Sequence, residues 1–84
     1  MALYLVTYDL RNPDFDYSGL TAKLQELGAK RVQDSVWMLR NKGTTTAALR
    51  DELTPHVHSK KDRLLVAKVK DWASRKAMAD INGI

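Results

Sequence analysis

One carboxylate stands where a sheet would present it to solvent: Asp9 directly follows an apolar run, residues 2–8, that ends in Tyr8. A short run that is apolar at successive positions predicts a strand buried on both faces, with Asp9 at its end. A lone aspartate there is commonly a turn former or a cap. A twofold axis near this strand end would instead pair two copies of Asp9, and such a pair could hold a hard cation such as Mg²⁺.

Other polar residues are weaker candidates for chemistry. Asp14 and Asp16 follow in a loop, where a solvated turn and a helix cap are the simpler expectations than auxiliary metal ligands. His56 and His58 have a spacing that metal sites use, but no third ligand is near, so surface histidines are expected. Ser35 has no histidine arranged for a triad, which favours a hydroxyl bonded to the backbone over a nucleophile.

The positive charge is concentrated near the C-terminus. Residues 1–55 carry seven bases and seven acids, so the net charge of +4 arises entirely from residues 56–84. A local excess of this kind can bind phosphates or form an ordinary solvated face. Of the two tryptophans, Trp37 is expected in the core, and Trp72 could stack on a base or pack on the fold. The bases of this segment are Lys60, Lys61, Arg63, Lys68, Lys70, Arg75 and Lys76.

The apolar periodicity predicts strands over residues 2–9, 29–34, 35–40 and 62–70. Leu20, Leu24 and Leu27 indicate a first helix that ends at Gly28, and a second helix around 48–53 must stop near Pro55. Residues 71–84 are predicted to form a short helix, because Ala73, Ala77 and Ile81 fall on one stripe.

This order, β-α-β-β-α-β, predicts one α+β domain of ferredoxin-like type over residues 1–84, with an antiparallel sheet, a core at 2–70 and a short helical tail at 71–84. Right-handed crossovers place both helices on one face of the sheet. The apolar residues on the other face then need a cover, and a sheet-to-sheet homodimer is the simplest one. The tail could dock on its own subunit or on the mate.

The composition of the chain limits the cellular compartment and the classes of binding site that are expected. The chain has 84 residues and no cysteine, which excludes disulfides and thiolate metal clusters and suits a reducing, cytoplasmic location. The opening apolar run is too short and lacks the basic flank of a signal peptide or a membrane span, so no membrane partner is expected. No phosphate-binding glycine loop or dinucleotide fingerprint occurs.

Two stretches together resemble a known family: residues 5–10, LVTYDL, and residues 28–37, GAKRVQDSVW. They are similar to the small CRISPR adaptation subunit, the second of the CRISPR-associated proteins, and to its relative virulence-associated protein D. The resemblance covers about residues 3–70. It implies a ferredoxin-like homodimer that acts on nucleic acid, either as a magnesium-dependent endonuclease or as a scaffold on duplex DNA, and as a ribonuclease in the relatives of virulence-associated protein D.

Carried over by position, the resemblance makes Asp9 the metal-binding carboxylate, with Tyr8 as its neighbour, and residues 35–37 part of the second motif. Two departures indicate a divergent, stand-alone subgroup, for which partnership with an integrase is a weaker expectation. The loop at 14–17 is acidic and aromatic where many members are basic, and residues 71–76 do not match the strand that many members add across the dimer.

Three functional hypotheses follow. The first is a nuclease in which paired Asp9 residues bind Mg²⁺ and activate water against a phosphodiester of RNA or DNA. The second is a non-catalytic dimer in which Asp9 is structural and basic residues only position nucleic acid. The third is a ferredoxin-like interaction module with no nucleic-acid role. The residues expected to grip the nucleic-acid backbone are Arg31, Lys60, Lys61 and Arg63.

Overall fold

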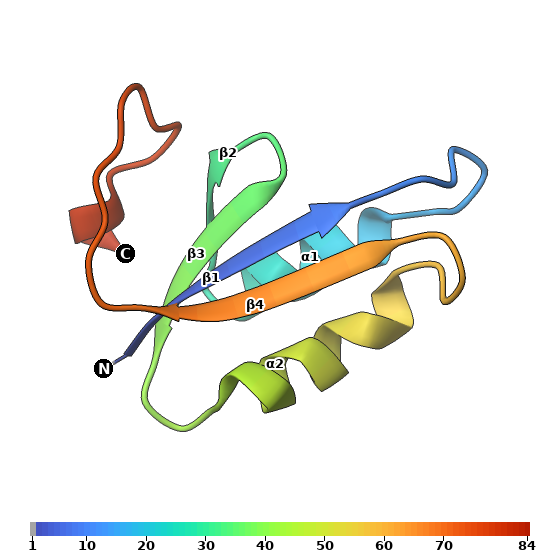
Figure 1. Cartoon of the computed structure of the whole chain (residues 1–84), viewed down its shortest axis with the longest axis horizontal. Helices are drawn as coiled ribbons and strands as arrows, with labels where there is room; N and C mark the ends of the chain where they lie inside the picture. The colour runs from blue at the N-terminus through green and yellow to red at the C-terminus, as the bar shows by residue number, and fades with distance from the viewer. Residues whose placement is uncertain (1) are drawn as a thin grey trace.

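The computed structural model describes residues 2–84, which form a four-stranded antiparallel sheet in the order β2-β3-β1-β4 with two helices (Figure 1). This arrangement confirms the predicted ferredoxin-like β-α-β-β-α-β domain. The elements are β1 (Ala2–Asp9), α1 (Ser18–Glu26), β2 (Lys30–Gln33), β3 (Val36–Asn41), α2 (Thr46–Leu53), the 3₁₀ turn η1 (Thr54–His56), β4 (Arg63–Val69) and the 3₁₀ turn η2 (Ile81–Gly83).

Strand β1 is central because it pairs on both sides. Leu5 lies opposite Met38 of β3 and Ala67 of β4 in the antiparallel register. Alternate residues of β1 point to opposite faces, so Tyr4 and Val6 belong to one cluster of buried side chains and Leu3 to another. A strand that is apolar on both faces is typical of the middle of a sheet, as the sequence predicted.

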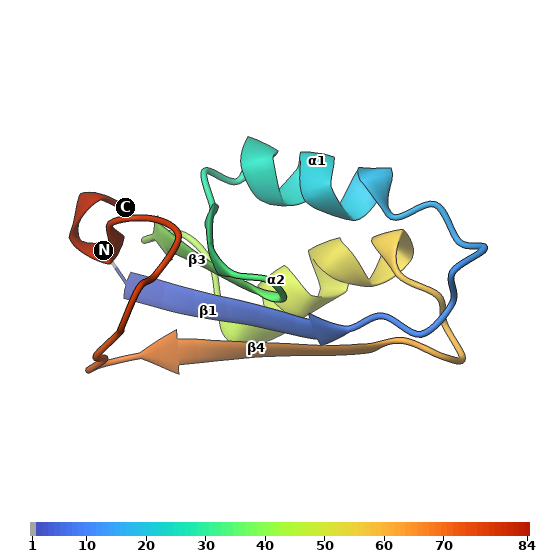
Figure 2. The ribbon, with the colours of Figure 1, turned by 90° about the horizontal axis from the view of Figure 1, so that it is seen from above.

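Both helices cover the same face of the sheet (Figure 2). Their leucines meet Tyr4, Val6, Trp37 and Leu39 in the main core. Local signals set the helix ends much as predicted. Gly28 follows α1 with a left-handed φ of 79°, and the Thr45 side chain accepts a hydrogen bond from the amide of Ala48 at the start of α2. The buried helix residues are Leu20, Leu24, Leu49 and Leu53.

The tail, residues 71–84, is not the short helix that the sequence predicted. It forms bends and the single 3₁₀ turn η2, and Lys76 adopts a left-handed φ of 58°. Of the stripe of Ala73, Ala77 and Ile81, only Ala77 and Ile81 pack on the sheet. Trp72, Ala79 and Ile84 pack there as well, and one helix could not turn Trp72 and Ala79 to the same face as Ala77 and Ile81.

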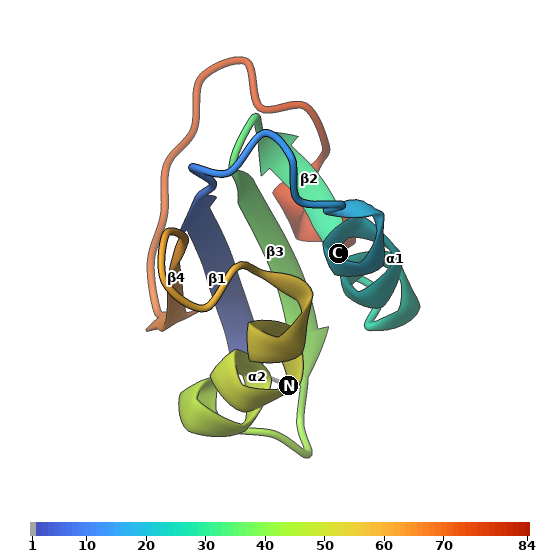
Figure 3. The same cartoon turned by 90° about the vertical axis from the view of Figure 1, so that its right-hand side faces the viewer.

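The tail lies on its own subunit, on the face of the sheet away from the helices, and arches from β4 toward β2 (Figure 3). The amide of Met78 donates to the Val32 carbonyl of β2 over 2.9 Å. The tail therefore docks on its own subunit, one of the two alternatives that the sequence left open, and it covers part of this face. The part beside β4 stays open, where the Leu65 side chain is 55% exposed.

Candidate functional site

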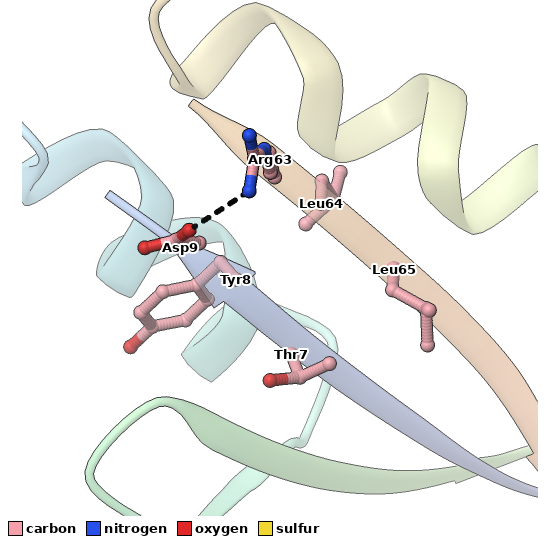
Figure 4. Close-up of a pocket in the computed structure, with 6 residues that line it drawn as sticks. All are labelled: Thr7, Tyr8, Asp9, Arg63, Leu64 and Leu65. Carbon is pink, nitrogen blue, oxygen red and sulfur yellow. Dashed lines mark ion pairs between the residues drawn. The ribbon is translucent and has the colours of Figure 1, made fainter. Parts of the chain in front are cut away.

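Asp9 ends β1 on the face away from the helices, opposite Arg63 at the start of β4. The two side chains point toward each other across the paired strands (Figure 4). They line a shallow cavity of about 280 Å³. The strand end therefore presents a carboxylate to an open cavity. The other lining residues are Thr7, Tyr8, Leu64 and Leu65.

Two guanidinium groups contact the same oxygen of Asp9. Arg11 lies 3.0 Å from Asp9 Oδ2 through Nε and 2.9 Å through Nη2, and Arg63 Nη1 lies 3.7 Å from it. The Asp9 side chain is 47% exposed, so solvent screens these contacts and each adds little to stability. Their main effect is to place positive charge beside the negative charge of Asp9 within one subunit.

Asp62 joins the loop after β1 to the connection before β4, and it was missed by the sequence reasoning. Its Oδ1 accepts the amide of Arg11 over 2.7 Å. Its Oδ2 accepts the hydroxyl of Tyr17 over 2.5 Å and the amide of His58 over 2.7 Å. Phe15 packs against the rings of both Tyr17 and His58. The acidic and aromatic loop at 14–17 thus clamps the basic connection in place.

These contacts shift the ionisation of the clamp. Burial alone would raise the pKa of Asp62, but the hydrogen bonds from Tyr17, Arg11 and His58 together hold the pKa of that carboxyl below its usual value. Partial burial, and then the bond to Asp62, raise the pKa of the Tyr17 hydroxyl. Both groups therefore keep their bonding forms at neutral pH, with Asp62 ionised and Tyr17 protonated.

Asp62→Asn is expected to lower the temperature midpoint of unfolding at pH 7. The asparagine side chain lacks the negative charge that three hydrogen-bond donors stabilise in the wild type. A carboxyl whose pKa is depressed by folding stabilises the fold above its unfolded-state pKa and loses that contribution as pH falls through the folded value. The gap between wild type and variant should therefore shrink from about pH 5 downward. Thermal melts at several pH values measure the gap. A gap that is constant with pH would contradict an ionised, bonded Asp62.

Arg31 does not lie on the same face of the sheet as Asp9, so the two residues could not contact the same phosphate group within one subunit. It lies on the helix side of the sheet, opposite Trp37 in the β2–β3 register. Its guanidinium lies 5.3 Å from the centre of the Trp37 ring and donates to the Tyr8 hydroxyl over 3.2 Å. Trp37 Nε1 donates to the same hydroxyl over 3.0 Å. Arg31 therefore braces the end of β1 from the face opposite Asp9.

Lys60 and Lys61 lie in the turn before β4, beside Arg63. Their backbone amides both donate to Nδ1 of His58 over 3.2 Å, so the imidazole organises the turn that displays the lysines. Neither lysine side chain makes an ion pair within residues 2–84, and both residues are exposed. His56 instead lies against Gly19 of α1, so the two histidines do not share a metal site.

The residues at this strand end do not fit a resident Mg²⁺ ion within one subunit. Asp9 already has two guanidinium groups on one oxygen, and these would repel a cation. Across the described residues 2–84, no three histidine, cysteine, aspartate or glutamate side chains gather as a set of metal ligands.

The model of the family described as CRISPR associated protein Cas2 matches residues 1–77. The chain belongs to this family. The match includes β1 with Tyr8 and Asp9, β2 with Arg31 and β3 with Trp37. The two motifs of the resemblance, residues 5–10 and 28–37, contact each other in the structure. Arg31 and Trp37 of the second motif both donate hydrogen bonds to the hydroxyl of Tyr8, the residue before Asp9 in the first. Within residues 2–84, no helix of this Cas2-family chain has the length and apolarity needed to cross a membrane.

Proposed function

We propose that this Cas2-family chain is a nucleic-acid-binding homodimer of CRISPR adaptation, and that it grips phosphates with the basic side chains at one end of its sheet. The observation that carries the proposal is the position of four bases on two neighbouring segments tied together by Asp62. They are Arg11, Lys60, Lys61 and Arg63.

The way the charges are paired at this end supports phosphate binding by the two lysines. Asp9 and Asp62, two of the acids here, are both engaged by groups of the same subunit. The ammonium groups of Lys60 and Lys61 are left to solvent within the part of the chain that is described. Lysines displayed on an ordered turn contact phosphates as point charges and position nucleic acid without reading its sequence.

A second candidate is the magnesium-dependent endonuclease in which two copies of Asp9 form one site. The specific observation in its favour is that Asp9 is half exposed and lines an open cavity on the face where a second copy would pack. In that dimer, Arg11 and Arg63 would have to leave the carboxylate. This is a testable requirement that the binding proposal does not share.

Asp9→Asn separates the two candidates. If Asp9 is structural, the variant keeps wild-type affinity for duplex DNA and RNA to within about fivefold, because an exposed ion pair is worth at most about 1 kcal/mol. If paired Asp9 residues bind metal, any magnesium-dependent cleavage falls by at least about 100-fold in the variant, the scale of losing a metal's charge stabilisation. The measurement is a gel assay with labelled RNA and duplex DNA, with and without magnesium.

Arg11→Gln is the matched control for the cleavage measurement, because it breaks the same ion pair from the other side and keeps the carboxylate; its affinity for nucleic acid should fall, since Arg11 is one of the four bases. The binding proposal predicts no cleavage by any of the three proteins. Metal-dependent cleavage by the wild type and Arg11→Gln, absent in Asp9→Asn, would establish the nuclease instead.

A further inference from the structure

Strand β4 lies at one edge of the sheet, because the strand order β2-β3-β1-β4 gives it a single neighbour. The Tyr8 amide donates to the Ser35 carbonyl over 3.3 Å, so the even-numbered residues of β1 bond toward β3 and the odd-numbered ones bond toward β4. In the register of β1 with β4, the even-numbered residues of β4 then direct their amide and carbonyl groups outward. They are Leu64, Val66 and Lys68.

This edge is suited to accept one more strand. A row of outward amide and carbonyl groups is a template for an extended segment, which pairs with it through its own backbone. Across residues 2–84, no other segment bonds the outward groups of Leu64, Val66 and Lys68. The strand Arg63–Val69 contains no proline and pairs with β1 without a bulge, so its edge is continuous.

A cavity of about 120 Å³ opens beside this edge, between β4 and helix α2. Helix α2 runs beside β4 (Figure 1). The cavity is lined by Thr46, Ala47 and Arg50 of the helix and by Val66 of the strand, and these walls suit one short side chain. In strand addition, main-chain bonds give affinity, and pockets for alternate side chains give specificity. The edge and the cavity together therefore form both parts of a site for an added strand.

The charges at this edge favour an acidic occupant. Strand β4 carries Arg63 and Lys68 and no acid. The ammonium group of Lys68 makes no ion pair within residues 2–84, and it lies on the same face as Val66, two residues away. Arg50 adds a second base at the cavity. A second copy of β4 would bring like charges together across the new pair of strands, which is destabilising.

We propose that the outer edge of β4 binds an extended, acidic segment of another protein, which adds as a further strand and places one side chain in the cavity beside α2. The outward groups of Leu64, Val66 and Lys68 bond the backbone of the segment, and a carboxylate of the segment pairs with the Lys68 ammonium group. The inference goes beyond the proposed nucleic-acid binding, because Val66, Lys68 and the cavity are not among the residues that binding uses.

Hydrogen exchange of the full chain, followed residue by residue by NMR, tests the edge directly. In the free protein, the amides of Leu64, Val66 and Lys68 should exchange fast, whereas those of Leu65 and Ala67, which bond β1, should be protected. The probe is a synthetic peptide of alternating valine and glutamate that matches β4 in length. We expect it to slow the exchange of the three outward amides at least about tenfold.

Two control peptides separate strand addition from charge attraction. The first replaces every glutamate by lysine and should leave the outward amides unprotected, because Lys68 repels it. The second keeps the glutamates and carries N-methyl groups on its backbone, so it cannot donate the main-chain bonds. It should also leave these amides unprotected. Equal protection by either control would contradict the added strand.

A pair of variants tests the cavity. Ala47→Leu fills it from an exposed position of α2, and Ala48→Leu makes the same change at an exposed residue that does not line it. Leucine supports a helix nearly as well as alanine, so both variants should fold. We expect Ala47→Leu to weaken binding of the acidic peptide at least about fivefold, the scale of overfilling a packed site, and Ala48→Leu to leave it within about twofold.

Three results would overturn the inference. The first is no protection of the outward amides by the acidic peptide at concentrations up to about 1 mM. The second is equal weakening by the two variants. The third is protection of the same amides by duplex DNA in place of the peptide, which would assign the edge to nucleic acid. None of the first two results affects the proposed function, which fails only if the wild type does not bind nucleic acid.

Discussion

Replacing Lys60 and Lys61 together with alanine should weaken the binding of duplex DNA by up to about 60-fold at about 0.1 M salt. The estimate assumes that each lysine neutralises one phosphate and releases about 0.9 counterion, which lowers the slope of log affinity against log salt by up to about two. Fluorescence anisotropy of a labelled duplex, titrated at several salt concentrations, measures both quantities.

The matched control removes the same charge elsewhere. Arg75→Ala with Lys76→Ala alters two exposed bases of the tail, beyond the far end of β4. Arg75 and Lys76 lie in the tail that arches toward β2, whereas Lys60 and Lys61 lie in the turn before β4, so the two pairs belong to different parts of the surface. We expect this control to lose only a few-fold in affinity. Equal losses in the two pairs would mean that net charge, rather than the turn before β4, drives binding.

Leu39→Ala is expected to destabilise the fold by about 2 to 5 kcal/mol, the range for truncating a fully buried leucine. Leu39 of β3 is 0% exposed and packs in the cluster formed by the sheet and both helices, so its loss leaves a cavity that its neighbours cannot fill. Since whole domains are stable by only about 5 to 15 kcal/mol, this variant should be close to unfolding at 37 °C. Urea denaturation followed by circular dichroism measures the change.

Leu65→Ala is the control on the opposite face of the same sheet. Its side chain is 55% exposed in one subunit, so the free energy of unfolding of the monomer should change by no more than about 0.5 kcal/mol. A loss as large as that of Leu39→Ala, measured in dilute protein where the monomer prevails, would contradict the assignment of Leu65 to an uncovered part of the sheet.

Much of the fold was predictable because its signals are local. The apolar residues on both faces of β1, the leucines of the first helix and Gly28 specify their elements without help from distant residues. The tail was mispredicted because its structure depends on a surface that the sequence does not display. Trp72, Ala79 and Ile84 pack where the sheet face offers contacts, and this packing overrides the helical stripe.

The site was predictable in part for the same reason. Asp9 could be placed at a strand end from its neighbours alone, whereas its pairing with Arg63 depends on the register of β1 against β4. Asp62 was missed because its donors, Arg11 and Tyr17, lie 51 and 45 residues away in the chain. Arg31 was grouped with the other bases on charge alone, and the alternation of side chains along the strands puts it on the opposite face from Asp9.

The most direct test of the proposed function is a binding titration of the wild-type protein with labelled duplex DNA and single-stranded RNA, carried out from about 0.05 to 0.2 M salt. We predict measurable binding at low salt to at least one of the two, with an affinity that falls steeply and linearly on logarithmic axes as salt rises. Absent binding, or an affinity that does not change with salt, would contradict a phosphate grip at this end of the sheet.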